Sequence, residues 1–145
     1  MGAHARYGKR VMQAAVGSNY YTDVGEPVEV PYEGESAHID GVIGSKIAVE
    51  VESRESKQVR AAVVDLICHP CPKKLLVLIP ANMNDVRATK KQCNAIFRQL
   101  GVSARRFRVV VLVGRGGRPR LKGDQRKVRV ALRELGWRRK GRGRL

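Results

Sequence analysis

The sequence predicts an α/β domain with a mixed central β-sheet and helices packed against it. Residues 75–79 are all apolar and are bounded by breakers, which indicates a strand buried on both faces, as in the middle of an α/β sheet. The elements predicted around this strand follow the order β-hairpin, helix, strand, helix, strand, which is typical of an α/β layer. The chain of 145 residues is long enough to bury one substantial core.

Each remaining element is predicted from its own periodicity or breakers. We expect helices over 5–16, 54–67 and 89–100, and strands over 28–32, 39–43, 47–52, 75–80 and 105–113. Ser53 is the expected N-cap of the second helix, and Gly101 closes the third. Strand 28–32 contains a proline, so it is expected at a sheet edge.

The strands 39–43 and 47–52 are predicted to form a hairpin whose register follows from its loop. A two-residue loop would mix charged and apolar side chains on each face of the hairpin. A three-residue loop pairs Ile43 with Ile47 and separates an apolar face from a polar one. Because a slip of one residue turns every side chain to the other face, burial of the apolar face should select the three-residue loop.

This register gathers three carboxylates, those of Asp40, Glu50 and Glu52, on the polar face. Asp40 and Glu50 would have Cβ atoms roughly 5 Å apart, with Glu52 about 7 Å along the strand. Carboxylates this close repel one another unless they are protonated or neutralised by a cation. Oxygen ligands suit Mg²⁺, so the hairpin is a candidate metal site for phosphodiester chemistry. The alternative is a solvated acidic hairpin, and the strongly basic remainder of the chain favours the metal site.

The order of these acids resembles the PD-(D/E)XK nuclease superfamily, which has the restriction-endonuclease-like fold. The resemblance covers roughly 28–113 and implies a mixed central β-sheet flanked by helices, with Asp40 and Glu50 as ligands of a divalent metal. The family usually places a lysine two residues after the second acid to assist the attacking water. Glu52 stands there in this chain, as glutamate does in some restriction endonucleases, and Ile39 stands where the family has a proline.

Lys57 and Gln58 are candidates to replace the missing lysine. The helix expected from residue 54 leaves the strand directly after Glu52, so its first turn would lie beside the acids. Either side chain could then orient water or the scissile phosphate. The alternative is that both are solvated residues on a helix packed against the core.

The charge of the chain predicts a polyanionic partner. It has 29 Lys and Arg against 13 Asp and Glu, a formal net charge of +16. Nucleic acid is the leading candidate and an anionic membrane surface the second. No apolar run approaches the roughly 18 residues that suggest a membrane span, and the N-terminus lacks an apolar signal-peptide segment. We therefore expect no membrane partner and a cytoplasmic location, associated with the nucleoid in a prokaryote.

The composition divides the chain into a nuclease-like core, 1–113, and a basic Arg/Gly-rich C-terminal extension, 114–145, with a helix expected over 124–135. Residues 115–145 hold 13 Lys and Arg against two acids, a net charge of +11 and most of the total. The residues expected to contact nucleic acid are Arg54, Arg115, Arg118, Arg120, Lys122, Arg126, Arg138, Arg139, Lys140 and Arg142.

Cys68 and Cys71 have the spacing of a zinc or redox motif. A structural zinc site would normally need a second pair of ligands, and only Cys93, His4 and His38 remain in the sequence. A turn with partly buried thiols is the favoured interpretation.

These observations predict a DNA endonuclease that depends on Mg²⁺ or Mn²⁺ and hydrolyses phosphodiester bonds, of the restriction type or of the repair or junction type. Duplex DNA is the expected substrate, and a two-fold homodimer is the simplest way to cut both strands. The alternatives are a non-catalytic nucleic-acid-binding protein, such as a ribosome-associated one, and a degenerate nuclease fold retained for binding.

Overall fold

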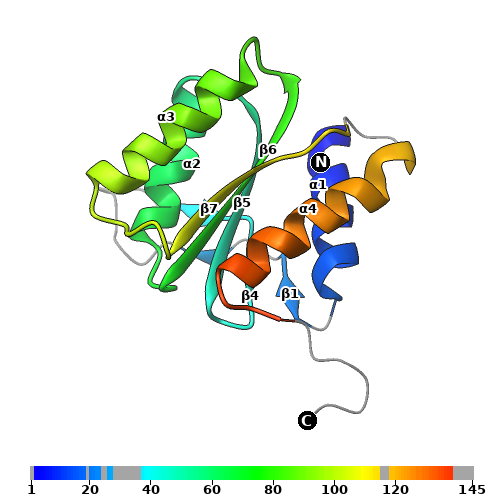
Figure 1. The fold of residues 1–145 in the computed structure, drawn as a ribbon, viewed down its shortest axis with the longest axis horizontal. Coiled ribbons are helices and arrows are strands. Elements are labelled where there is room, and N and C mark those ends of the chain that lie inside the picture. Colours follow the sequence, from blue (N-terminus) through cyan, green and yellow to red (C-terminus); the bar gives the residue numbers. More distant parts are fainter. Residues whose placement is uncertain (1, 19, 24–25, 28–36, 115–117, 139–145) are drawn as a thin grey trace.

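The computed structural model describes residues 2–18, 20–23, 26–27, 37–114 and 118–138 (Figure 1). The helices are α1 (Ala3–Val16), α2 (Lys57–Cys68), α3 (Val86–Gln99) and α4 (Leu121–Glu134), with a short 3₁₀ helix at Arg118–Arg120. The strands are β1 (Tyr21–Thr22), β2 (Glu26–Pro27), β3 (His38–Ile39), β4 (Gly41–Ile43), β5 (Ile47–Arg54), β6 (Lys73–Asn82) and β7 (Phe107–Val111). The strand expected over 28–32 lies outside the described residues.

The main sheet has five strands in the order β1-β4-β5-β6-β7. The pairs β1–β4 and β4–β5 are antiparallel, whereas β5–β6 and β6–β7 are parallel. The strands β2 and β3 form a separate two-stranded antiparallel sheet. The predicted α/β class with a mixed central sheet is therefore confirmed.

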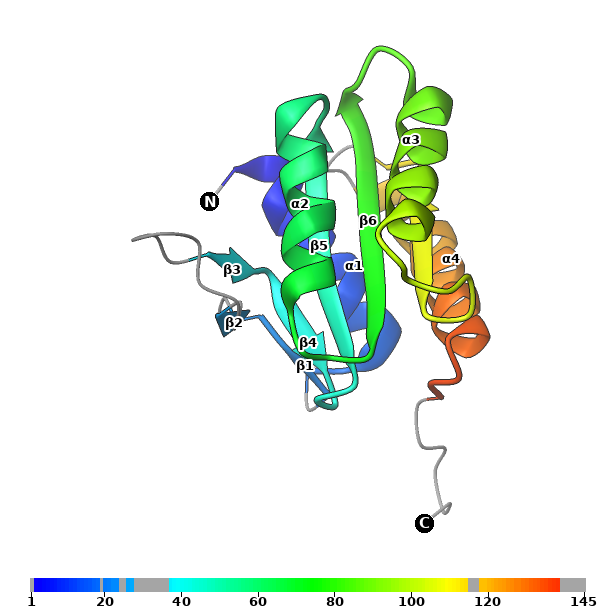
Figure 2. The same ribbon diagram turned by 90° about the vertical axis from the view of Figure 1, so that its left-hand side faces the viewer.

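Helices cover both faces of the main sheet. The pair α1 and α4 lies on one face and the pair α2 and α3 on the other (Figure 1), and Figure 2 shows α2 in front of β5 with α1 behind it. In β6, Leu75 and Val77 pack under α1 and α4, while Leu76 and Leu78 pack under α2 and α3. All four are fully buried, so β6 is the two-sided core strand that its apolar run predicted.

All four helices begin at residues other than those expected, and the causes are clear for α2 and α3. α2 begins at Lys57 because β5 continues to Arg54 and the chain then turns at Ser56, where φ is 64°. The expected N-cap Ser53 is therefore part of the strand. α3 begins at Val86, because the Asp85 side chain accepts a hydrogen bond from the Ala88 amide at 3.0 Å and caps the first turn.

The helix expected over 124–135 begins at Leu121 and packs within the core. Val128 and Leu132 of α4 are fully buried against α1 and the sheet. The segment set apart as a basic extension by composition thus contributes one of the two helices on this face. No helix among the described residues is both long enough and apolar enough to cross a membrane.

Candidate functional site

The hairpin that carries the predicted acids has the expected register at its turn. Ile43 pairs with Ile47 across the three-residue loop Gly44–Lys46. The ladder ends at Gly41, where a Cβ atom would lie 2.2 Å from the Thr22 carbonyl oxygen, so only glycine fits.

The expectation of a continuous strand over 39–43 is wrong, because the strand breaks at Asp40. Ile39 turns away and pairs with Glu26 in the small sheet. Its side chain packs under α2 with that of Ala48. The part of the expected polar face nearest the turn is therefore buried under α2. The acids lie beyond it, where the β4–β5 hydrogen-bond ladder ends.

At this break the carboxylates of Asp40 and Glu50 take the place of ladder hydrogen bonds. The Asp40 amide donates to Glu50 Oε1 at 2.7 Å, and the Val51 amide donates to Asp40 Oδ2 at 2.6 Å. The structure therefore brings together the two acids that the sequence proposes as metal ligands, and they share one hydrogen-bond network.

The two carboxyl groups resist being ionised together. Desolvation raises the pKa of Glu50 to about 9, and the negative charge of Asp40 adds to the shift. The pKa of Asp40 is also raised, first by burial, although its bond from the Val51 amide opposes the shift. Among the described residues, no basic side chain forms an ion pair with either acid. At neutral pH the pair therefore holds a proton in a position that a cation could take.

The pair opens into the carboxyl pocket, a cavity of about 560 Å³ at the end of β5. Its lining includes Asp40, Glu50 and Glu52 together with His4 of α1 and His38 of β3. Neither histidine was predicted as a site residue: His4 is far from the acids in the sequence, and His38, two residues before Asp40, was considered only as a possible zinc ligand. The fold places His4 here because α1 runs along β5, where Gly8 approaches so closely that a Cβ atom would lie 2.5 Å from Val51 Cγ1.

A smaller cavity of about 70 Å³ lies on the other side of Asp40, lined by Lys9, Tyr21 and Asp23 among others. Lys9 Nζ and Asp23 Oδ2 form an ion pair at 2.9 Å. The pKa of Tyr21 is raised, mainly by burial and next by the charge of Asp40. Lys9 is thus a lysine that lines a cavity together with Asp40. Its position in the sequence did not predict this.

Glu52 lines the carboxyl pocket, but its carboxylate is turned to its own backbone. Oε2 accepts from the amides of Ser53 and Arg54, both at 2.9 Å, and from Arg54 Nε at 3.1 Å. The Glu52 residue is 9 % exposed, whereas the Arg54 side chain is 63 % exposed. Glu52 therefore fixes the bulged end of β5, and its negative charge still raises the pKa of Asp40.

Lys57 and Gln58 do not line the carboxyl pocket. Both are exposed, because α2 begins three residues later than the sequence suggested. Asp65, further along α2, is instead close enough for its charge to raise the pKa of Glu50. The negative charge that raises the pKa of Glu50 therefore comes from Asp40 first and from Asp65 as well.

The donor set fits a hard cation better than a soft one. Among the residues that the structure describes, no group of three or more His, Cys, Asp or Glu side chains could hold a metal ion. Two carboxylates that line one cavity remain, and Mg²⁺ is commonly bound by one or two carboxylates with waters and substrate phosphates completing its shell. Asp40 and Glu50 satisfy that requirement.

The predicted nucleic-acid contacts are spread over several surfaces. Arg54, Arg120, Lys122, Arg126 and Arg138 are exposed. Only the backbone of Arg118 is described, in the 3₁₀ helix, while Arg115, Arg139, Lys140 and Arg142 lie outside the described residues. Arg126 also lines a groove of about 480 Å³ between α3, β7 and α4, with Lys90, Arg108 and Lys127.

The CxxC segment forms a turn, and its two thiols form no disulfide. Cys71 is buried and Cys68 partly buried, and the Cys71 amide donates to His69 Nδ1 at 3.1 Å. Lys74 Nζ donates to the carbonyls of His69 and Cys71. Burial lowers the pKa of Lys74. These contacts hold the chain between α2 and β6.

No protein-family model, curated protein or solved structure matches this chain.

Proposed function

We propose that this protein is a divalent-metal-dependent endonuclease that hydrolyses phosphodiester bonds in DNA, on a restriction-endonuclease-like core. The observation that carries the proposal is that Asp40 and Glu50 lie together in the lining of the carboxyl pocket, where each carboxylate accepts a hydrogen bond from a backbone amide at the strand break. A chain of net charge +16 that binds a polyanion gains nothing from two acids facing phosphate unless a cation lies between them. A metal ion removes that repulsion.

Asp40 and Glu50 would hold Mg²⁺ or Mn²⁺ in this site. The ion would supply charge neutralisation and polarisation of the scissile phosphate, and it would lower the pKa of a water nucleophile. Because binding displaces the proton that the pair shares, metal affinity should rise with pH up to about the pKa of Glu50, near 9.

The neighbouring side chains have distinct roles in this proposal. Glu52 keeps β5 and the pair in place through the amides of Ser53 and Arg54. His4 and His38 line the same pocket, and histidine is the side chain whose ordinary pKa suits proton transfer near neutral pH. Lys9 takes the place of the missing motif lysine more readily than Lys57 does, because it shares a cavity with Asp40.

The parallel half of the sheet gives independent support for this location. In open α/β sheets, ligands bind beyond the carboxyl ends of the strands. The carboxyl pocket lies at the carboxyl end of β5, which is the strand where the sheet changes from antiparallel to parallel pairing.

A plasmid assay tests the proposal. Purified protein is incubated with supercoiled plasmid and Mg²⁺ or Mn²⁺, and then with chelator. We expect nicking that the chelator abolishes and that Asp40→Asn and Glu50→Gln each lower at least about 100-fold, the scale of losing a preorganised electrostatic group. Glu134→Gln is the matched control, because Glu134 is an exposed acid of α4 outside the carboxyl pocket.

The second candidate is a nucleic-acid-binding protein without catalysis, and one observation favours it. Both acids already satisfy backbone amides at the strand break, and Glu52 is engaged with Arg54, so the network could be structural. A protein that binds DNA tightly in chelator, and that cuts neither plasmid nor single strands with either metal, would establish this candidate and exclude the nuclease.

A further inference from the structure

A further pocket, separate from the three described above, lies on the α1 and α4 side of the molecule, at the carboxyl end of α4. Ala15, Arg129, Arg133, Trp137 and Arg138 line this arginine–tryptophan pocket, whose volume is about 220 Å³. Since a water molecule in liquid occupies about 30 Å³, the pocket has room for a larger group. Three guanidinium groups and an aromatic ring line it, with no carboxylate among them.

Arg129 is held in place by the end of α1. Its Nε donates to the Ala15 carbonyl and its Nη2 to the Ala14 carbonyl, each at 3.2 Å. Arginine has five N–H donors in a planar fork. The Nη1 group has no hydrogen bond among the described residues, so a fixed cation still has donors to offer.

Trp137 is fixed by its neighbours and remains partly exposed. Its amide donates to the Leu132 carbonyl at 2.9 Å, and its ring meets that of Tyr20 edge to face, with the centroids 6.2 Å apart. The first turn after α4 is thus tied to the helix, and it presents an indole ring in the wall of the pocket.

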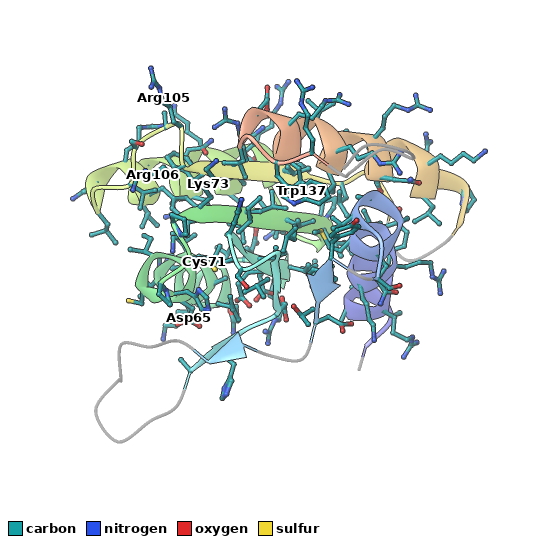
Figure 3. The ribbon with its side chains drawn as sticks, turned by 90° about the horizontal axis from the view of Figure 1, so that it is seen from below. Asp65, Cys71, Lys73, Arg105, Arg106 and Trp137 are labelled. Carbon is teal, nitrogen blue, oxygen red and sulfur yellow. The ribbon has the colours of Figure 1, made fainter. Side chains whose placement is uncertain are left out.

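The charged side chains that line the pocket are all positive, while the nearby Glu134 is paired with Arg108. Arg133 and Arg138 are exposed, and neither forms an ion pair within the described part of the chain. Lys73 Nζ donates to the Leu135 carbonyl, two residues before Trp137, and Figure 3 labels both Lys73 and Trp137. The pocket therefore suits a ligand that has both an anionic group and a flat ring.

We infer that the arginine–tryptophan pocket binds one unpaired nucleotide of the nucleic-acid substrate, with its base against Trp137 and its phosphates between Arg133 and Arg138. Aromatic rings stack on bases of any sequence, and arginines contact the backbone. The inference rests on the proposed function for its partner. It deepens that function by naming DNA with a single-stranded part, such as an overhang, a flap or a junction, as the substrate class.

The spacing of the two pockets agrees with one continuous substrate. His4 lines the carboxyl pocket and Ala15 lines the arginine–tryptophan pocket, so both lie along α1. Eleven helical positions span about 16 Å at ~1.5 Å per residue. This length corresponds to about five nucleotide steps at ~3.4 Å each.

The chain has a single tryptophan, so its fluorescence reports on this pocket alone. The protein is titrated in chelator, where no cleavage occurs, with a short oligothymidylate, with a blunt duplex, and with the same duplex carrying a single-stranded overhang. Labelled DNA gives total binding by anisotropy. We expect Trp137 quenching with the single strand and the overhang, and none with the blunt duplex.

Variants separate stacking from charge. Loss of stacking in Trp137→Ala should weaken single-strand binding by about 5- to 140-fold, the equivalent of ~1–3 kcal/mol per base. Trp137→Phe keeps an aromatic ring, and it should retain most of the affinity even if the alanine variant folds poorly. The Arg133→Gln, Arg138→Gln double variant should lower the salt slope by about 1.4, because each single-strand phosphate contact contributes about 0.7.

Arg98→Gln is the matched control, because Arg98 is an exposed arginine in the last turn of α3, as Arg133 is in the last turn of α4. Equal affinity and salt slope in Arg98→Gln and in the double variant would overturn the inference. So would quenching by the blunt duplex alone, or by anionic vesicles and not by DNA. If the protein binds DNA but Trp137 fluorescence does not change, only the role of the arginine–tryptophan pocket is excluded. If the protein binds no DNA at all, the proposed function is excluded as well.

Discussion

Asp124 is a fully buried acid, whereas in the Asp40–Glu50 pair Asp40 is exposed and Glu50 is partly buried, beside a cavity. Asp124 is 0 % exposed and accepts three hydrogen bonds, from the Tyr7 hydroxyl at 2.5 Å and from the amides of Val113 and Gly114 at 2.7 and 2.8 Å. Asp40 and Glu50 receive one amide each and otherwise face each other. The buried acid is therefore fully supplied with hydrogen-bond donors, whereas each acid of the more exposed pair receives only one.

The difference assigns separate tasks to the two sites. The Asp124 carboxylate joins α1, α4 and the end of β7, and a Cβ atom on Gly114 would lie 2.2 Å from the Tyr7 hydroxyl, so the contact leaves no spare space. The Asp40–Glu50 pair lies beside a cavity and keeps its repulsion. The first site has all of its donors within the fold, whereas we propose that the second binds a cation.

The largest expected effect comes from removing the Asp124 carboxylate. Asp124→Ala leaves the Tyr7 hydroxyl and two amides buried without an acceptor, so we expect the free energy of unfolding to fall by about 3–5 kcal/mol. Urea denaturation monitored by circular dichroism measures the change. A loss below about 1 kcal/mol would show that water replaces the carboxylate and would remove the contrast between the two sites.

In metal-free protein, Glu50→Gln should raise the free energy of unfolding, whereas Asp124→Ala should lower it. Because the folded-state pKa of Glu50 is raised from 4.5 to about 9, the folded state binds more protons than the unfolded state between these values. Wild-type stability should therefore fall as pH rises through this window.

In chelator at pH 8 we expect Glu50→Gln to be more stable than wild type by about 1–3 kcal/mol, with little difference at pH 4. Thermal unfolding at both pH values measures it, with Glu134→Gln as the control. A variant less stable than wild type at pH 8 would mean that the carboxylate is satisfied, as that of Asp124 is.

Tyr7→Phe tests one donor of the Asp124 network. Removing the hydroxyl leaves the carboxylate with its two amide donors, so we expect a loss of about 1–2 kcal/mol. The comparison with Asp124→Ala in the same denaturation experiment shows how much the amides contribute. Unchanged stability would mean that the two backbone amides alone account for the stabilising effect of the Asp124 carboxylate.

Arg54→Ala should change stability least. Its ion pair with Glu52 is exposed on the arginine side, so the expected loss is below about 0.5 kcal/mol. Removing Arg54 does free part of the Glu52 carboxylate next to the carboxyl pocket. If Glu52 assists the proposed metal, the variant should need less Mg²⁺ for half-maximal nicking than wild type does. A higher requirement would instead give Arg54 a role in binding DNA.

Sequence periodicity was sufficient for the parts of the fold in which burial is two-sided or register is fixed by a turn. The apolar run of β6 and the pairing of Ile43 with Ile47 are the clearest cases. The break at Asp40 was not predictable, because it depends on Ile39 leaving for a second small sheet and on acids replacing ladder bonds. Local patterns contain no such information.

The remainder of the site depends on contacts between distant segments. His4 and Lys9 reach the acids only because α1 crosses β5 at Gly8, where the fit with Val51 is too close for any larger residue. Composition likewise set α4 apart as part of a basic extension, although its buried stripe of Val128 and Leu132 packs on α1. Charge on the exposed side of a helix does not reveal what the opposite side covers.

The most direct test of the account is whether Mg²⁺ displaces a proton from the Asp40–Glu50 pair. Calorimetric titration of Mg²⁺ at pH 8, in two buffers of different ionisation enthalpy, gives the number of protons released per ion bound. We predict release of close to one proton by wild type, and weak binding without release by Glu50→Gln, because the carboxamide has no acidic proton to lose. Binding that releases no proton, or that is the same in both proteins, would contradict the account.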